Sequence, residues 1–408
     1  MENLGHFGEP FFMGNAAKLD DPSADLALYR EKCSVYYNRP LNQWFVFRYD
    51  DVVALFMDSR LSANRMSGFV EQAPEAVRER LRQLTPFFRS GVMMMDGPDH
   101  ARTRKFLNLG FNETAVQRLT PAIERSARAL LDAVPKDGRF DVAGNYGFLL
   151  PAYVLSDFLG VRAEDRESLL RWSVDFVDFF NIFPITVESS ERMIRSAQEM
   201  NAYIVSLLEE RRKNPRQDFL GVLIEAGHGS GGLTGQEIAG NAMLLLLAGH
   251  VAVRNLIGNA VYLLLSYPNA KQKLDADQSL LTDVIDETLR FEPPVTLIPR
   301  IALEDLEVSG QLIPKGALVQ LSIAAANRDP RHFPDPDRFN VTPGRARAVS
   351  FGHGPHGCLG AHLARMQSEI ALRELFRRFP APSLDPSRSI EWYRTAANRG
   401  PARLPIIT

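Results

Sequence analysis

A single cysteine within a glycine-rich loop is the clearest candidate for chemistry in this chain. Residues 351–360 read FGHGPHGCLG and hold Cys358, one of two cysteines among 408 residues. Glycines allow tight turns and let the backbone lie close to a flat or bulky group. The next residues, LGAHLARMQSEIALRELFRRF, carry apolar side chains at helical spacing. We therefore predict that Cys358 stands at a helix N-terminus, where the helix dipole favours a thiolate.

Three interpretations of this loop are open from the residues alone. Cys358 can be a small buried apolar residue, as lone cysteines often are. It can belong to a structural zinc site of a helical protein, together with His353, His356 and His362. Zinc ligands normally come from separate turns or elements, which argues against one short loop. It can also be a thiolate that ligates haem iron, with the glycines letting the loop lie beneath the porphyrin.

The composition is that of a soluble globular protein and gives no sign of a nucleic-acid partner. Apolar residues make up 45% of the 408 and charged residues 24%, and the formal net charge is −2. Length alone would suggest two or three domains. Two cysteines far apart in the sequence fit a reducing compartment. The start, MENLGHFGEPFF, lacks the basic-then-apolar pattern of a signal peptide, so we expect a cytoplasmic protein with no membrane anchor.

Helices dominate the elements that must position these residues. Residues 44–58 read WFVFRYDDVVALFMD and predict a short strand that runs into a helix, and other strand-like segments concentrate in residues 300–321. The sequence therefore predicts a mainly α fold with small β-sheets. Amphipathic helices are expected at residues 101–111, 114–134, 146–159, 163–181, 187–213 and 218–226.

One long apolar helix is expected to cross the middle of the molecule. Thr234 and Glu237 form a capping box, and the apolar pattern NAMLLLLAGHVAVRNLIGNAVYLLL continues from there until a proline ends it. Polar residues such as His250 would be costly in lipid, so a buried helix is favoured over a transmembrane one. The small residues Ala248 and Gly249 would let a flat ligand approach the helix backbone.

These segments together resemble the cytochrome P-450 family. The stretch FGHGPHGCLGAHLAR is similar to its haem-binding signature, F-G-x-G-x-H-x-C-x-G followed by a helix. HARTRK, AGH and DETLR resemble the family's H-x-x-x-R pair, oxygen-binding helix segment and E-x-x-R pair, in the family's order. The resemblance covers nearly the whole chain and is to soluble bacterial members. It implies one catalytic domain, residues 1–408, with the cytochrome P-450 fold and its long central helix over haem.

The resemblance implies haem b as the cofactor and a role for each motif. Cys358 would be the proximal iron ligand, whose thiolate favours O–O bond cleavage. Glu287 and Arg290 would form a buried ion pair that fixes the segment leading to the cysteine loop. Cationic or hydrogen-bonding partners would hold the haem propionates. The residues that would contact haem, besides Cys358, are His100, Arg104, Ala248, Gly249, Arg300, Phe351, His356 and Gly360.

The central helix departs from the family where proton delivery is organised. Aligned with A-G-x-E/D-T, the segment AGHVA places Val251 at the acid position and Ala252 at the alcohol position. Drift in a nonfunctional enzyme is disfavoured, because the rest of the haem motifs match. We favour a substrate hydroxyl, carboxyl or amide that holds the proton-donating water. The alternative is atypical chemistry, such as oxidative coupling, nitration or peroxide-driven oxidation. Arg254 could anchor a polar substrate group or belong to a buried structural pair.

The resemblance also implies a pocket and partners. An apolar pocket suits a medium-sized natural-product intermediate of secondary metabolism, hydroxylated or epoxidised with O₂, and leaves a fatty acid open. The chain shows no flavin or nicotinamide fingerprint, so electrons are expected from ferredoxin and ferredoxin reductase. The pocket residues would be Met94, Val251, Ala252, Val295 and Ala396. The basic residues expected near the proximal face are Arg102, Arg104, Lys105, Arg345, Arg347 and Arg365.

Overall fold

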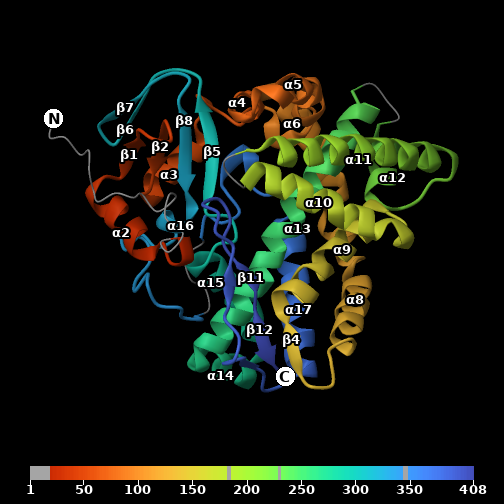
Figure 1. The fold of residues 1–408 in the computed structure, drawn as a ribbon, viewed down its shortest axis with the longest axis vertical. Coiled ribbons are helices and arrows are strands. Elements are labelled where there is room, and N and C mark those ends of the chain that lie inside the picture. Colours follow the sequence, from red (N-terminus) through yellow and green to blue (C-terminus); the bar gives the residue numbers. More distant parts are fainter. Residues whose placement is uncertain (1–18, 182–184, 228–230, 343–347) are drawn as a thin grey trace.

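The computed structural model describes residues 19–181, 185–227, 231–342 and 348–408. Within this part of the chain, a mixed sheet lies on one side and helices fill the other (Figure 1). The strand order is β1-β2-β8-β5-β3, with β2 parallel to β8 and the other neighbours antiparallel. These strands are β1 (Val35–Asn38), β2 (Gln43–Val46), β3 (Leu61–Ser62), β5 (Leu297–Ala302) and β8 (Leu318–Ser322).

The predicted helices are present, and one predicted interval is divided by a proline. The interval 114–134 holds two helices, α7 (Glu113–Gln117) and α8 (Thr120–Asp132), instead of one. Pro121 lies in the first turn of α8, where its missing N–H is tolerated, whereas it would break a continuous helix. The other predicted helices are α6 (Gly97–Gly110), α9 (Leu149–Leu159), α10 (Arg166–Asn181), α11 (Val187–Lys213) and α12 (Phe219–Ala226).

The strand-into-helix segment is confirmed as β2 followed by α3 (Tyr49–Met57). The remaining strands form three small antiparallel sheets, one of which lies in the predicted interval 300–321. They are β6 (Leu306–Val308) with β7 (Gln311–Ile313), β12 (Pro405–Ile407) between β4 (Arg139–Asp141) and β9 (Ser383–Leu384), and β10 (Glu391–Trp392) with β11 (Pro401–Arg403). Helices outside the predicted intervals include α2 (Ser23–Lys32), α4 (Met66–Gln72), α5 (Glu75–Arg89), α14 (Pro268–Ala276) and α16 (Ile323–Ala326).

The central helix α13 (Gly235–Ser266) crosses the molecule (Figure 1). Its 32 residues span about 48 Å at the usual rise. The predicted capping box is confirmed, since Thr234 Oγ1 accepts from Glu237 N at 3.2 Å and the Glu237 carboxylate accepts from Thr234 N at 2.8 Å. By length and composition α13 could cross a membrane, but most of its apolar stretch is buried within the fold. It packs against α9, α10, α11, α15 (Leu281–Phe291) and α17 (Ala361–Arg378), as a core helix does.

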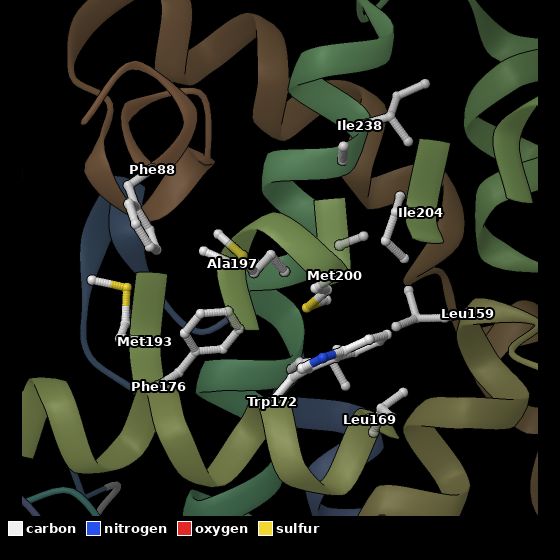
Figure 2. Close-up of a cluster of buried hydrophobic side chains, with 14 of the residues drawn as sticks. Phe88, Leu159, Leu169, Trp172, Phe176, Met193, Ala197, Met200, Ile204 and Ile238 are labelled. Carbon is white, nitrogen blue, oxygen red and sulfur yellow. The ribbon is translucent and has the colours of Figure 1, made fainter. Parts of the chain in front are cut away.

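An apolar cluster fastens α10 and α11 to α13. Figure 2 shows Trp172 and Phe176 of α10 beside Met193 and Met200 of α11, with Ile238 of α13 in the same cluster. All five are nearly or fully buried, and each contributes roughly 1.5–3 kcal/mol of hydrophobic stabilisation. The cluster therefore fixes the position of α10 relative to the middle of α13.

Candidate active site

The cysteine loop is built from turns that favour glycine. Gly352 and Gly354 both have a φ of +71°, in the left-handed region that side chains rarely adopt. A 3-10 turn, η6 (Gly354–His356), follows, and the Cys358 N–H donates to Phe351 O at 2.7 Å. Helix α17 begins three residues after Cys358. The expected position of the cysteine just before a helix is confirmed.

Two opposing influences act on the pKa of the Cys358 thiol. Although part of the side chain is accessible to solvent, protein atoms crowd it on the other sides, and this burial raises the pKa of the thiol. A hydrogen bond from the Gly360 N–H and the cations Arg104 and Arg365 lower that pKa, but by less. The helix start acts in the expected direction and is outweighed by desolvation. A metal ion bound to the sulfur would lower this pKa and favour the thiolate.

The histidines of the loop do not form a zinc site. Over the described ranges, which include His353, His356 and His362, no three His, Cys, Asp or Glu side chains are grouped to hold a metal ion. His356 instead packs against His100 of α6, with ring centroids 4.0 Å apart. The zinc interpretation is therefore wrong, because the turns of the loop place His356 against His100 and away from the other loop histidines.

That cluster gathers two histidines and an arginine around a single carboxylate. His100, Arg300 of β5 and His356 come together, and His356 Nε2 lies 3.8 Å from Asp96 Oδ1. Burial, His100 and Arg300 lower the pKa of His356 to about 4, and burial lowers the pKa of Arg300 to about 10. The buried His100 Nε2 has no hydrogen-bond partner among the described residues. A ligand with two carboxylates, as haem has, fits these groups.

Sequence reasoning missed Arg65, which belongs to the same cluster. Its Nη1 donates to Ala63 O at 3.0 Å. Burial and the charge of Arg300 lower the pKa of Arg65 to about 9, although Asp96 acts against this. Nothing in the segment LSANRM marks this arginine, because arginines in polar segments mostly lie in solvent. Because its guanidinium is buried beside the positive charge of Arg300, Arg65 is a further candidate for binding the haem carboxylates.

The other expected haem contacts flank the loop. Arg104 is half-buried on α6, one turn after His100. The Phe351 ring is covered by the Arg365 guanidinium, 4.5 Å from its centroid. Gly360 is the N-cap of α17, and its conformation does not itself require glycine. Contact of Arg104, Phe351 and Gly360 with haem stays a prediction.

The middle of α13 has one open strip. Ala248 is exposed and Ala252 is half-buried, and positions i and i+4 share a helix face. Val251 beside them is buried, with 8% of its surface exposed. Gly249 faces elsewhere, since a Cβ there would lie 3.3 Å from the Leu155 side chain of α9. The missing side chain of Gly249 thus lets α9 pack closely, while Ala248 lines the strip. Contact of Ala248 and Gly249 with haem stays a prediction.

His250 is locked on the opposite side of α13. Its Nδ1 is 2.7 Å from Ser173 Oγ of α10, and its Nε2 is 2.7 Å from Phe148 O. A carbonyl can only accept, so Nε2 carries the proton and Nδ1 accepts from Ser173. Burial lowers the pKa of His250 to about 4. The residue is neutral and fully engaged, and it does not replace the missing acid.

Arg254 serves the structure. Its guanidinium donates to the Tyr393 hydroxyl and, at 2.9 Å, to Ala402 O. It also lies over the Phe148 ring, 5.2 Å from the centroid. These contacts tie α13 to the C-terminal strands and leave the side chain turned away from Ala248 and Ala252. Of the two interpretations of Arg254, the structure favours the buried structural one.

The segments that carry Val295 and Ala396 pair at the C-terminal turn. Val295 forms an isolated antiparallel bridge with Asn398, and the Thr296 hydroxyl donates to Ala396 O. Thus the segment that follows α15 packs against a turn near the C-terminus. Met94 lies apart from them in the short turn η2 (Val92–Met94) and is buried in the apolar cluster of Figure 2.

Glu287 and Arg290 form a two-pronged ion pair on α15. Both nitrogen–oxygen distances are 2.8 Å, and the Arg290 and Glu287 side chains are 1% and 3% exposed, respectively. Arg290 also donates to Asn327 O, Pro336 O and Arg338 O at 3.2, 2.8 and 2.9 Å, and Glu287 accepts from Asn340 N at 2.9 Å. The pair therefore holds residues 327–340, which lead toward the cysteine loop, onto α15.

Comparison with known proteins decides the family. A family model described as Cytochrome P450 matches residues 66–390. The chain is a cytochrome P450. It is 36% identical over 367 residues to the vitamin D(3) 25-hydroxylase of Pseudonocardia autotrophica, covering 89% of this chain and 87% of that one. It is 35% identical over 383 residues to the 6-deoxyerythronolide B hydroxylase of Saccharopolyspora erythraea, covering 92% and 93%. The crystal structure of P450BioI with a fatty-acyl carrier protein has a TM-score of 0.88 at 29% identity, covering 97% and 100%.

This cytochrome P450 is accordingly a haem-thiolate monooxygenase related to bacterial biosynthetic hydroxylases. Its mainly helical fold with small sheets is the family fold. Haem, when bound, supplies the activation of O₂ from which one oxygen atom enters a small-molecule substrate. The orphaned His100 nitrogen, the buried Arg300 guanidinium near Asp96 and the accessible Cys358 sulfur fit that group.

Proposed function

We propose that this cytochrome P450 hydroxylates or epoxidises a medium-sized, partly apolar natural-product intermediate in secondary metabolism. The names of the relatives support this class, because one acts on 6-deoxyerythronolide B and another on vitamin D(3). The apolar Val251, Ala252, Val295 and Ala396 suit such a ligand. The cofactor is haem b, the catalytic unit comprises residues 1–408 as one domain, and the enzyme works in the cytoplasm.

Proton delivery is assigned to the substrate. The observation that carries this assignment is the state of residues 250–254 on α13. Val251 and Ala252 have no polar side-chain atoms, His250 is neutral and bonded at both nitrogens, and Arg254 is bonded to the C-terminal segment. No side chain of this stretch can hold a proton-donating water at the open strip. A hydroxyl, carboxyl or amide of the substrate, within about 3 Å of that water, supplies the missing contact.

A panel of compounds tests this proposal. The compounds are 6-deoxyerythronolide B, vitamin D(3) and hexadec-9Z-enoic acid, and binders are found by the shift of the haem absorption band. The tightest binder is then compared with analogues that each lack one hydroxyl or carboxyl. Removing the assisting group should raise peroxide release per NADH several-fold, and Ala252→Thr should partly restore coupling with the truncated analogue. If every truncated analogue is turned over with undiminished coupling, substrate assistance is refuted.

The second candidate is chemistry that avoids the ordinary relay, namely oxidative coupling, nitration or peroxide-driven oxidation. The same two residues, Val251 and Ala252, favour it. Efficient product formation with hydrogen peroxide alone, without NADH and a redox partner, would establish it over the first candidate.

Ferredoxin and ferredoxin reductase are proposed as the electron donors. Lys105 on α6 is exposed, but two of the other expected docking cations are already paired: Arg102 with Glu237, and Arg365 with Asp286 at 2.9 Å. Arg345 and Arg347 lie outside the described residues. Docking through few free cations should still weaken with salt. Turnover that does not change between 50 and 500 mM NaCl, taken as about a threefold change in Debye length, would contradict an electrostatic partner.

A further inference from the structure

The end of α5 and the turn η2 lie directly against α13, close to its open strip. Two glycines permit this approach. A Cβ at Gly91 would overlap the Leu244 side chain, and a Cβ at Gly240 would lie 2.9 Å from Phe87 O, so a larger residue at either position would push the two segments apart. Leu244 is one turn before Ala248 on the same helix face. The crossing segment therefore stands at the edge of the strip.

Asn241 fastens this segment to α13 through its whole amide. Its Oδ1 accepts from Val92 N at 2.9 Å, and its Nδ2 donates to Ser90 O at 3.2 Å and to Glu237 O at 2.7 Å. Asn241 is 1% exposed, so water does not compete for these hydrogen bonds. One side chain thus holds an N–H and a carbonyl that lie two residues apart in the segment, which fixes both its position and its rotation.

Asp96 holds the other end of the same segment. Its Oδ1 accepts from Ala63 N at 2.9 Å, and its Oδ2 accepts from the Ser62 hydroxyl at 2.5 Å. Between the two attachments lie three consecutive methionines, Met93–Met95, of which Met94 is 2% exposed and the other two are half-buried. Unbranched methionine side chains adapt to the surface that they contact. The backbone that carries them, in contrast, is fixed at both ends.

We propose that Asn241 is a positioning residue that presets the pocket wall Met93–Met95 beside the Ala248–Ala252 strip before a substrate enters. Because the backbone of this wall is already ordered, a ligand binds without the free-energy cost of ordering it. The wall selects ligands whose bulk fits its fixed distance from α13, and the methionine side chains adjust to the detailed shape. The inference rests on the proposed pocket, to which Met94 belongs, and adds the residue that sets its dimensions.

Two sets of variants separate positioning from stability. Asn241→Leu removes the three hydrogen bonds of the amide. Gly91→Ala pushes the segment away from Leu244 and leaves the amide intact, and Leu244→Ala added to it returns the space. Asn38→Leu is the matched control, because Asn38 is 3% exposed and its Oδ1 accepts from Leu41 N at 2.9 Å in the turn that joins β1 to β2.

The measurements on the haem-loaded enzyme use probes that do not depend on the natural substrate. Imidazole and 4-phenylimidazole both bind haem iron through a ring nitrogen, and they differ in the bulk that reaches the wall. Their dissociation constants are obtained from the shift of the haem absorption band. The order of the backbone at residues 90–95 is measured by hydrogen exchange.

Asn241→Leu should speed exchange at residues 90–95 roughly tenfold and weaken 4-phenylimidazole several-fold relative to imidazole. Gly91→Ala should shift the same ratio of dissociation constants, and Leu244→Ala added to it should reverse that shift in part. Asn38→Leu should lower the melting temperature and change neither the exchange nor the ratio.

Unchanged exchange or an unchanged ratio in folded Asn241→Leu overturns the proposal. Should that variant not fold, Gly91→Ala and its combination with Leu244→Ala decide by the same ratio, and an unaltered ratio in Gly91→Ala again overturns it. A panel from which no natural-product compound binds defeats the proposed function alone, because neither azole depends on it, so the two failures are distinct.

Discussion

His250 of α13 accepts a hydrogen bond from Ser173 of α10, with 2.7 Å between Nδ1 and Oγ. Its other nitrogen donates to Phe148 O, so one neutral imidazole joins α13 to α10 and to the segment before α9. Because the ring is fully buried, proton uptake would break the contact with Ser173 and leave a charge in the core.

This arrangement makes stability depend on pH. The pKa of His250 is lowered by burial from its ordinary 6.5 to about 4. Between pH 6.5 and about 4, His250 is protonated in the unfolded chain but stays neutral in the folded chain. The free energy of unfolding therefore falls as the pH drops through this range and levels off below about pH 4. The full loss is about 3 kcal/mol. His250→Gln cannot titrate and should show a flatter curve of unfolding free energy between pH 7 and 4.5, measured by urea denaturation. An unchanged slope would contradict the assignment.

Replacing Cys358 by serine should remove the thiolate spectrum. The sulfur is the only proposed iron ligand of the loop, and a serine oxygen does not give the red-shifted Soret band of the reduced carbon monoxide complex. Cys33→Ser is the control, because Cys33 is buried in another cluster, where burial raises its pKa to about 11. A thiolate band that persists in Cys358→Ser would show that the ligand is elsewhere.

Breaking the Glu287–Arg290 pair should destabilise the fold or cause loss of haem, and it should not selectively change the kinetics. Glu287→Gln leaves the Arg290 charge buried at 1% exposure, which destabilises by about 3–5 kcal/mol. Haem content and melting temperature measure this loss. Glu391→Gln serves as the control, since Glu391 pairs with Arg403 at an exposed site where little stability is at stake. Equal melting temperatures for the two variants would argue against the assigned role.

Arg65→Ala should weaken haem retention. Removing a crowded cation next to Arg300 relieves repulsion in the haem-free protein, so its melting temperature should hold or rise, while transfer of haem to apomyoglobin should be several-fold faster. Arg60→Ala is the control, because Arg60 is exposed and paired with Asp58 at 2.6 Å. Equal transfer rates for the two variants would remove Arg65 from the carboxylate-binding cluster.

Several features were predictable because they depend on neighbours in the sequence. The glycines around Cys358 set the turns of the loop, the capping box begins α13 at Thr234, and three-residue spacing on one helix brings Glu287 to Arg290. Each rests on local backbone geometry that a few adjacent residues determine. The same is true of the apolar Val251 and Ala252, whose positions follow from their spacing after Ala248 and Gly249.

Other features were decided only by contacts between distant segments. The Gly249 backbone lies close to Leu155 of α9, and Arg254 bonds to Tyr393 and Ala402 near the C-terminus. Arg65 belongs to the carboxylate-binding cluster because it lies near Arg300. Likewise, the pKa of the Cys358 thiol is governed by burial, which no short stretch of sequence reveals. Sequence thus determined which chemical groups this protein has and the local turns that carry them. The tertiary structure decided which of those groups are desolvated, bonded or left unpaired, because burial and hydrogen bonding are properties of the assembled neighbours.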